Sequence, residues 1–202
     1  MLKKFNAVTY TSDDEKYVRE AFIDGQAVEL TAMNPGNYNP NLPGMIGLVD
    51  LDGTAFGREI GKTGHAIMFE YVDGQNIRMY VEKVLYHMAP AARIARYLGM
   101  SHKLIEAYKK TYMDKGFVNG DLDTLGILVE DAADGGNRIV FVDNDTTTHV
   151  GDTGELAIYK RAAFKEAYAR ETRVKQRKKW MCGQEVSAND MCDARDDLYS
   201  LF

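Results

Sequence analysis

Two apolar runs decide the fold: Gly126-Ile127-Leu128-Val129-Glu130 and, a few residues later, Arg138-Ile139-Val140-Phe141-Val142. Both runs are rich in β-branched and aromatic side chains, which favour strands. Between them stand Asp134-Gly135-Gly136-Asn137, residue types that supply the positive φ angles and side-chain hydrogen bonds of a tight turn. The pattern predicts an antiparallel β-hairpin.

Three earlier segments have a similar strand-like composition, namely residues 45–51, 65–72 and 77–85. Asp73-Gly74, between the last two, is a hairpin turn signal, so the three segments are predicted to form an antiparallel sheet. Residues 34–44 hold three of the four prolines, which lack an amide donor and have a fixed φ. This stretch is predicted to be a long ordered loop or a flap.

Two helices are predicted from their starting residues. Ser12 and Glu15 have the spacing of a capping box, which indicates a short N-terminal helix that ends at Gly25. Asp152 and Glu155 suit the start of a last helix, which would continue into a basic segment.

Further helices are predicted in the middle of the chain. Pro90 suits the first turn of a helix that ends at Gly99, and Ser101 suits the start of the next. Hairpins and helices occur in blocks rather than in alternation, which indicates the α+β class: antiparallel β-hairpins or a sheet packed with several helices.

The charge of -5 is sorted along the chain. Residues 160–179 contain nine basic and two acidic residues, whereas residues 181–202 contain one basic and five acidic residues. The rest of the chain therefore carries a net charge of about -8. We expect an acidic α+β body over residues 1–159, a basic helix or arm over 160–180 and an acidic C-terminal tail over 181–202.

Composition argues against a zinc-bound or disulfide-linked small domain and against a membrane-spanning protein. A chain of 202 residues that is 45% hydrophobic can bury a core large enough to fold without disulfides or metal. Cys182 and Cys192 form no zinc or disulfide pattern, and no apolar run is long enough to span a bilayer. We expect a cytoplasmic protein with no cofactor and no metal, in the host cytoplasm if a phage encodes it.

The basic segment combines phosphate-neutralising charge with an aromatic ring that can stack on a base. Its candidate residues are Arg170, Arg173, Lys175, Arg177, Lys178, Lys179 and Trp180. A second basic and aromatic region contains Arg93, Arg96 and Tyr97. These are the two ingredients of sequence-tolerant binding to single-stranded nucleic acid. The alternative is that the charges form the solvated face of a helix and the tyrosines belong to the core.

The last ten residues, Asp193-Ala194-Arg195-Asp196-Asp197-Leu198-Tyr199-Ser200-Leu201-Phe202, are similar to the acidic, phenylalanine-ended tips of bacterial and phage single-stranded DNA-binding proteins. The resemblance implies that Asp193, Asp196, Asp197 and Phe202 recruit replication or transcription proteins and compete with DNA for basic groups. The alternative is a short amphipathic helix that docks on the body or on another subunit.

Leu48-Val49-Asp50-Leu51-Asp52-Gly53-Thr54 resembles the first motif of haloacid-dehalogenase-type phosphotransferases. The resemblance implies that Asp50 is a nucleophile, Asp52 a general acid and base, and Asp152 a ligand of magnesium. The residues themselves favour another interpretation. Glycines interrupt the stretch that follows, so Leu51-Asp52-Gly53 is predicted to be a turn between antiparallel strands.

Three functions follow from these patterns. The preferred one is non-enzymatic binding of single-stranded nucleic acid, DNA in preference, by a phage-type replication or transcription accessory factor that forms homo-oligomers. The second is a protein-interaction factor that inhibits a host enzyme through its acidic body. The third is a phosphatase that uses Asp50 and Asp52.

Overall fold

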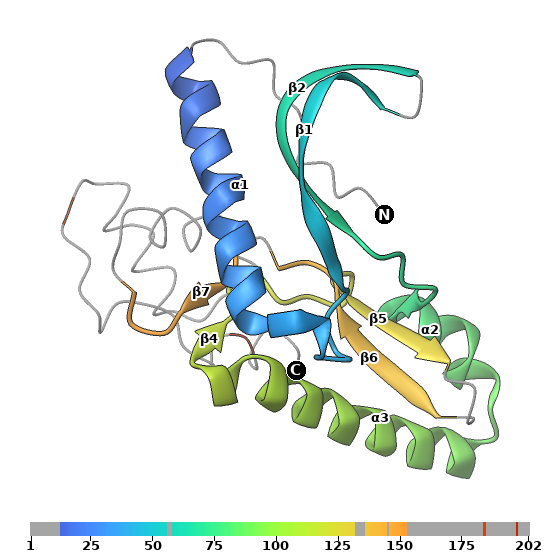
Figure 1. Cartoon of the computed structure of the whole chain (residues 1–202). Coiled ribbons are helices and arrows are strands. Elements are labelled where there is room, and N and C mark those ends of the chain that lie inside the picture. Colours follow the sequence, from blue (N-terminus) through green and yellow to red (C-terminus); the bar gives the residue numbers. More distant parts are fainter. Residues whose placement is uncertain are drawn as a thin grey trace. The chain divides into compact units, whose positions relative to one another are not determined.

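The computed structural model describes residues 13–55, 58–131, 136–144 and 146–152, together with Gln184 and Asp197. It confirms the α+β class, with helices and antiparallel strands (Figure 1). The chain divides into two compact units: unit 1 comprises residues 1–38 and 43–71, and unit 2 comprises 39–42 and 72–202. Charge and composition did not indicate this division.

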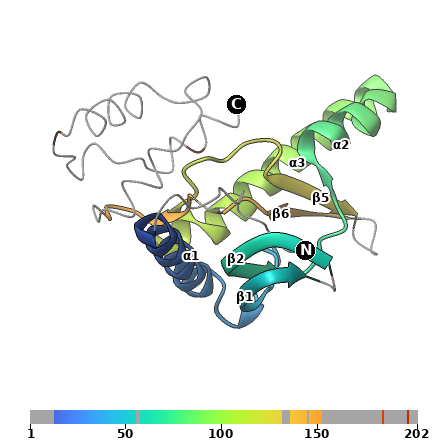
Figure 2. The same ribbon diagram turned by 90° about the horizontal axis from the view of Figure 1, so that it is seen from above.

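Unit 1 combines one long helix with one long hairpin. Its elements are α1 (Asp13–Met33), the 3-10 turn η1 (Pro35–Asn37), β1 (Met45–Ala55) and β2 (Arg58–Phe69). The two strands are antiparallel, and α1 runs beside them in both views (Figures 1 and 2). Ile23 and Leu30 of α1 pack with Ile67 of β2, which gives the otherwise isolated hairpin an apolar core.

The helix α1 continues past Gly25, where the sequence predicted its end. A glycine inside a helix costs only about 1 kcal/mol relative to alanine, and burial of Leu30 against the hairpin offsets this. The helix ends before Pro35, because the residue that precedes a proline is disfavoured in the α conformation.

The predicted turn at Leu51-Asp52-Gly53 is wrong. These residues belong to β1, where Asp50 is opposite His65 and Asp52 is opposite Thr63. The register shifts between Asp52 and Thr54, so the glycine stands in a bulge rather than in a turn. The chain reverses later, between Ala55 and Arg58.

Unit 2 contains the predicted hairpin. Its strands are β3 (Gln75–Asn76), β4 (Phe117–Val118), β5 (Ile127–Asp131), β6 (Asn137–Phe141) and β7 (Thr148–His149). β5 and β6 pair antiparallel, which confirms the prediction, and β3 joins them in the order β3-β5-β6. β4 and β7 form a separate pair. Its helices are α2 (Ile77–Lys83) and α3 (Pro90–Thr111), with 3-10 turns η2 (Leu85–His87) and η3 (Met113–Lys115).

The segment 77–85, predicted to be a strand, forms α2 and the start of η2. The side chain of Asn76 caps the helix, because its Oδ1 accepts the Met79 amide hydrogen at 2.8 Å. Arg78 and Glu82, one turn apart, form an ion pair at 3.2 Å. Tyr80 is buried, so tertiary packing and the cap outweigh the strand propensity of the β-branched residues.

The two helices predicted on either side of Gly99 are one continuous helix, α3. Pro90 occupies its first turn, as predicted. The residues Met100, Leu104, Ala107, Tyr108 and Thr111 are buried along one face, so packing holds the helix together through the glycine. Figure 2 shows α2 and α3 close to the β5–β6 hairpin. None of the helices in the described part of the chain is long and apolar enough to cross a membrane.

The proline-rich loop has no strand, as predicted, but residues 39–42 are anchored to unit 2. The Asn41 carbonyl accepts the Phe141 amide hydrogen at 2.9 Å, and the Asn41 Nδ2 donates to the Ile139 carbonyl at 2.8 Å. β6 is the last strand of its sheet. The loop therefore satisfies backbone groups that an open sheet edge would leave unpaired.

Replacing Asn41 with alanine is expected to lower the free energy of unfolding by about 1–2 kcal/mol, because the Ile139 carbonyl loses its donor. Denaturant unfolding of the full chain measures the change. Asn41→Asp is the matched variant: its size is unchanged, but a carboxylate cannot donate, so it should destabilise at least as much. Equal stability of all three proteins would contradict an edge-capping role for the side chain.

Candidate functional site

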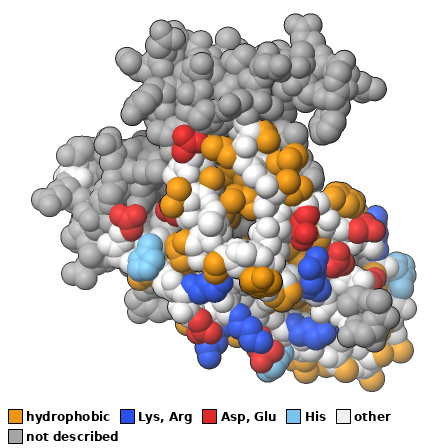
Figure 3. Space-filling view, in the orientation of Figure 1, with side chains coloured by type: hydrophobic (Ala, Val, Ile, Leu, Met, Phe, Trp, Pro, Cys, Tyr) orange, Lys and Arg blue, Asp and Glu red, His pale blue; other side chains and the backbone are white. Residues whose placement is uncertain are grey.

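The helix α3 is basic, although the chain as a whole is acidic. It carries five basic residues and one acidic residue: Arg93, Arg96, Lys103, Lys109, Lys110 and Glu106. Basic side chains gather in the lower part of the surface view, where α3 lies in Figure 1, with several acidic side chains among them (Figure 3). Such a local excess of cations attracts anions.

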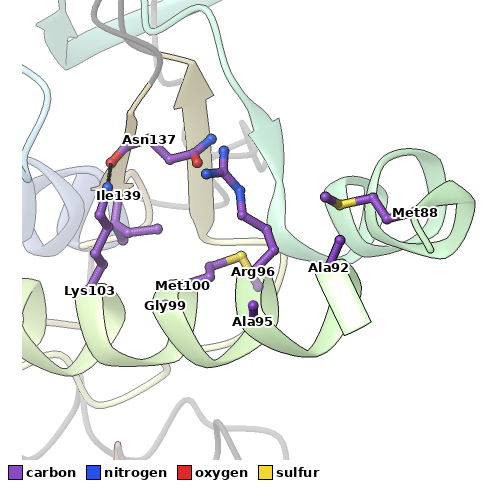
Figure 4. Close-up of a pocket in the computed structure, with 9 residues that line it drawn as sticks. All are labelled: Met88, Ala92, Ala95, Arg96, Gly99, Met100, Lys103, Asn137 and Ile139. Atoms are coloured by element: carbon purple, nitrogen blue, oxygen red, sulfur yellow. Dashed lines mark hydrogen bonds between the residues drawn. The ribbon is translucent and has the colours of Figure 1, made fainter. Parts of the chain in front are cut away.

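A groove of about 410 Å³ lies between α3 and the edge of β6 (Figure 4). Residues of α3, the segment after η2 and β6 line it: Met88, Ala92, Ala95, Arg96, Gly99, Met100, Lys103, Asn137 and Ile139. The lining is mostly apolar, and its only charged residues are cations. The volume is in the range of pockets that hold small ligands.

Arg96 and Lys103 rise from α3 toward the Asn137 end of β6 (Figure 4). They are seven residues apart, which is two helical turns or about 10.5 Å along the axis. The Arg96 Nε donates to the Tyr80 hydroxyl at 3.2 Å, and the Lys103 Nζ donates to the Asn137 carbonyl at 3.2 Å. Each hydrogen bond orients its cation toward the groove, and each cation has further N–H groups that can serve a ligand.

Gly99 lies between the two cations in the lining of the groove. No heavy atom lies within 4 Å of the place where a Cβ would stand, and its φ is not positive. Neither close packing nor backbone conformation therefore requires a glycine here. It lowers helix stability relative to alanine, and its effect on the surface is to deepen the groove.

Of the three α3 residues predicted to bind nucleic acid, only Arg96 lines the groove. Arg93 donates hydrogen bonds to the carbonyls of Tyr86 and Met88, at 2.8 and 3.1 Å, and lies over the Tyr86 ring. It holds η2 against α3, so its interactions are structural. Tyr97 is half exposed and lines a second hollow of about 330 Å³, with Ile77 and Thr124.

Most of the predicted basic segment and tail lies outside the described residues. This applies to Arg170, Arg173, Lys175, Arg177, Lys178, Lys179, Trp180, Asp193, Asp196 and Phe202. The predicted helix that starts near Asp152 also falls there. Of the predicted tail residues, Asp197 is described.

Asp197 occupies a buried socket. Its carboxylate accepts hydrogen bonds from the Tyr108 hydroxyl and the Asn119 and Gly120 amides, at 2.7, 2.7 and 2.8 Å. Gly120 has a φ of 88°, so the two successive amides form a concave anion site. The side chain is 1% exposed. The carboxylate is therefore buried in this arrangement, and recruitment of partners by the other tail residues stays a prediction.

A buried polar cluster adjoins this socket. The Tyr112 hydroxyl donates to the Asn144 Oδ1, and the Asn119 Nδ2 donates to the Asp143 carbonyl at 2.8 Å. Burial raises the pKa of Tyr112 well above its ordinary value, a hydrogen bond with Asn119 lowers it, and the charges of Asp197 and Asp143 raise it further. The phenol therefore remains neutral and retains the proton of its hydrogen bond to the Asn144 Oδ1.

The phosphotransferase-like motif lacks the strand context of that family. Asp50 and Asp52 lie in an antiparallel hairpin, whereas the resemblance requires a parallel strand that leads into a helix. Asp152 belongs to unit 2, and its amide donates to the His149 carbonyl at 3.2 Å. Among the residues that the structure describes, no cluster of three or more His, Cys, Asp or Glu could hold a metal ion.

The comparisons with known proteins add no assignment. The sequence matches none of the known family models, and it shows no significant similarity to any curated protein. The candidate site therefore rests on the residues and geometry of this chain alone.

Proposed function

We propose that the chain binds single-stranded nucleic acid, DNA in preference, without catalysing a reaction. In this proposal it acts in the cytoplasm as a replication or transcription accessory factor of phage type. It binds by neutralising phosphates and contacting bases. Assembly into homo-oligomers would place several binding segments along one strand and raise their effective concentration.

The observation that carries the proposal is the groove beside α3, where the only charged lining residues are Arg96 and Lys103 and the remaining surface is mostly apolar. The cations suit the phosphates of a strand, and the apolar surface suits a base. The sequence adds nine basic residues over 160–179, with Trp180 directly after them. The chain as a whole is acidic, so its basic groups are concentrated in these two regions rather than spread over the whole sequence.

A protein-interaction factor is the second candidate, and one observation favours it. Ile94, Leu98 and Ile105 are 61%, 63% and 47% exposed. Their spacing of four and seven residues places them on one stripe of α3, away from the stripe that contains Gly99. Exposed apolar side chains in a row are typical of protein contacts, including contacts between copies of this chain.

Titration of the full chain with single-stranded DNA, duplex DNA and RNA at several salt concentrations tests the proposal. Four to six phosphate contacts give a log-log salt slope of roughly -3 to -4. Alanine at Arg177, Lys178 and Lys179 should make this slope shallower by about 2. Trp180→Ala should cost about 1–3 kcal/mol of binding energy with an unchanged slope, because it removes stacking and no charge.

Failure of all three nucleic acids to bind at low salt would contradict the proposal. The second candidate function is tested with Leu98→Glu, which places a charge in the apolar stripe and should prevent contacts between copies of the chain. Loss of a wild-type oligomer in this variant, measured by analytical ultracentrifugation, would support the protein-interaction function instead.

A further inference from the structure

We propose that the groove between α3 and β6 is the binding site for one nucleotide of the strand, an assignment that rests on the proposed function. The phosphates on either side of the nucleotide contact Arg96 and Lys103. The base enters between them and lies over Gly99, against Met100 and Ile139, whereas Met88 lines the groove on the far side of Arg96 (Figure 4). The site thus recognises a nucleotide by its charge and flat shape and not by its sequence.

The cations are arranged for a ligand with two separated anionic groups. The Arg96 Nε donates to the Tyr80 hydroxyl, and its terminal nitrogens lie toward Asn137 at the groove (Figure 4), where their N–H groups can donate to a phosphate. Lys103 uses one donor for the Asn137 carbonyl and retains two. Two helical turns separate the residues, which leaves room for a base between the charges.

The apolar part of the groove suits a flat aromatic body. Between the two cations its large apolar side chains are Met100 and Ile139, and the flexible thioether of Met100 makes favourable contacts with aromatic rings. Met100 is buried in unit 2, so it forms a firm floor. A ligand with charge alone would gain nothing from this surface.

Gly99 supplies the space for the base. It is the one lining position on α3 with no side chain, and the place of a Cβ there is open. This arrangement offers a variant that blocks the groove without disturbing the fold: Gly99→Leu fills the space and also increases helix propensity. Gly99→Ala increases helix propensity to a similar degree but adds only one methyl group, and it is the matched control.

Two measurements on the full chain test the assignment. Binding of a labelled single-stranded oligothymidylate should weaken roughly tenfold in Gly99→Leu, as expected when one base contact is lost, and less than twofold in Gly99→Ala. In the ¹⁵N-labelled protein, thymidine monophosphate should shift the amide resonances of Gly99, Lys103 and Ile139, and Gly99→Leu should abolish the shifts. Inorganic phosphate alone should leave the Ile139 resonance unchanged.

A charge test accompanies these variants. Arg96→Gln with Lys103→Gln should make the salt slope shallower by about 1.4. Lys109→Gln removes a charge from the same helix but outside the groove lining, so its effect should be smaller. Thermal denaturation of every variant verifies that the fold is retained.

The outcomes distinguish this assignment from the proposed function. Oligothymidylate binding that is the same in wild type and Gly99→Leu would overturn the groove assignment and leave single-strand binding in place. Nucleotide-induced shifts at the groove without oligonucleotide binding would overturn the proposed function and the assignment to a strand, and would show a site for a free nucleotide instead. Equal shifts with an acidic peptide would overturn the assignment, because they would show recognition of charge alone.

Discussion

Replacing Asp197 with alanine is expected to lower the free energy of unfolding by about 3–5 kcal/mol, because several buried donors lose their acceptor at once. The carboxylate accepts three hydrogen bonds from the Tyr108 hydroxyl and two consecutive amides, and it is 1% exposed. Without it, these donors lose this acceptor in a buried site, and each lost hydrogen bond carries a desolvation cost. Urea unfolding followed by circular dichroism measures the loss.

The controls separate the socket from a general effect of charge. Asp197→Asn retains the shape, but its amide group offers only one oxygen, so we expect a loss between those of the alanine variant and wild type. Asp73→Ala removes the same charge from an exposed position in unit 2 and should change stability by less than about 0.5 kcal/mol. A similarly small loss for Asp197→Ala would show that the socket does not hold the carboxylate in solution.

Alkaline pH is expected to destabilise the protein through Tyr112. Burial raises the pKa of its phenol far above the ordinary value of 10.0. Between pH 10 and the higher folded pKa, the unfolded chain releases the proton while the folded chain retains it. The folded state then binds more protons than the unfolded state. The contribution of Tyr112 to the free energy of unfolding is therefore fully present below about pH 10. Above about pH 10 the free energy of unfolding falls by about 1.4 kcal/mol per pH unit.

Urea unfolding at several values from pH 8 to pH 11.5 measures this fall. Tyr112→Phe removes the ionisable group, so the decline of its unfolding free energy with pH should be shallower by up to one proton equivalent. The same variant loses the hydrogen bond to Asn144, and its stability at pH 8 should therefore be lower by about 1 kcal/mol. An identical pH dependence in both proteins would assign the alkaline loss to other groups.

Local signals predicted the elements whose stability is local. The β5–β6 hairpin combines two β-rich runs with turn residues between them, and its strands pair as those signals require. The segment 77–85 has similar strand propensity, yet it is helical because Asn76 caps it and Tyr80 is buried. Differences in strand and helix propensity of a few tenths of a kcal/mol per residue are smaller than the free energy gained from a helix cap and a buried tyrosine.

The site was predictable only in part. The charge pattern indicated Arg96. Lys103 belongs to the site because it contacts β6, which is more than thirty residues later in the sequence. Gly99 was interpreted as the end of a helix, because a glycine in sequence does not reveal whether it breaks a helix or opens a space. The socket of Asp197 could not be predicted from the sequence, since the Tyr108, Asn119 and Gly120 donors are at least 77 residues away from it along the chain.

The distance along the chain between the socket and Asp197 also has a consequence in time. Gly120 is synthesised 77 residues before Asp197. At about 5–20 residues per second, the ribosome needs about 4–15 s to add the carboxylate after the second amide. During that interval unit 2 of the nascent chain lacks the Asp197 carboxylate that accepts the hydrogen bonds of its buried donors. A chain that stops short of residue 197 remains without this acceptor and is expected to be less stable than the finished chain.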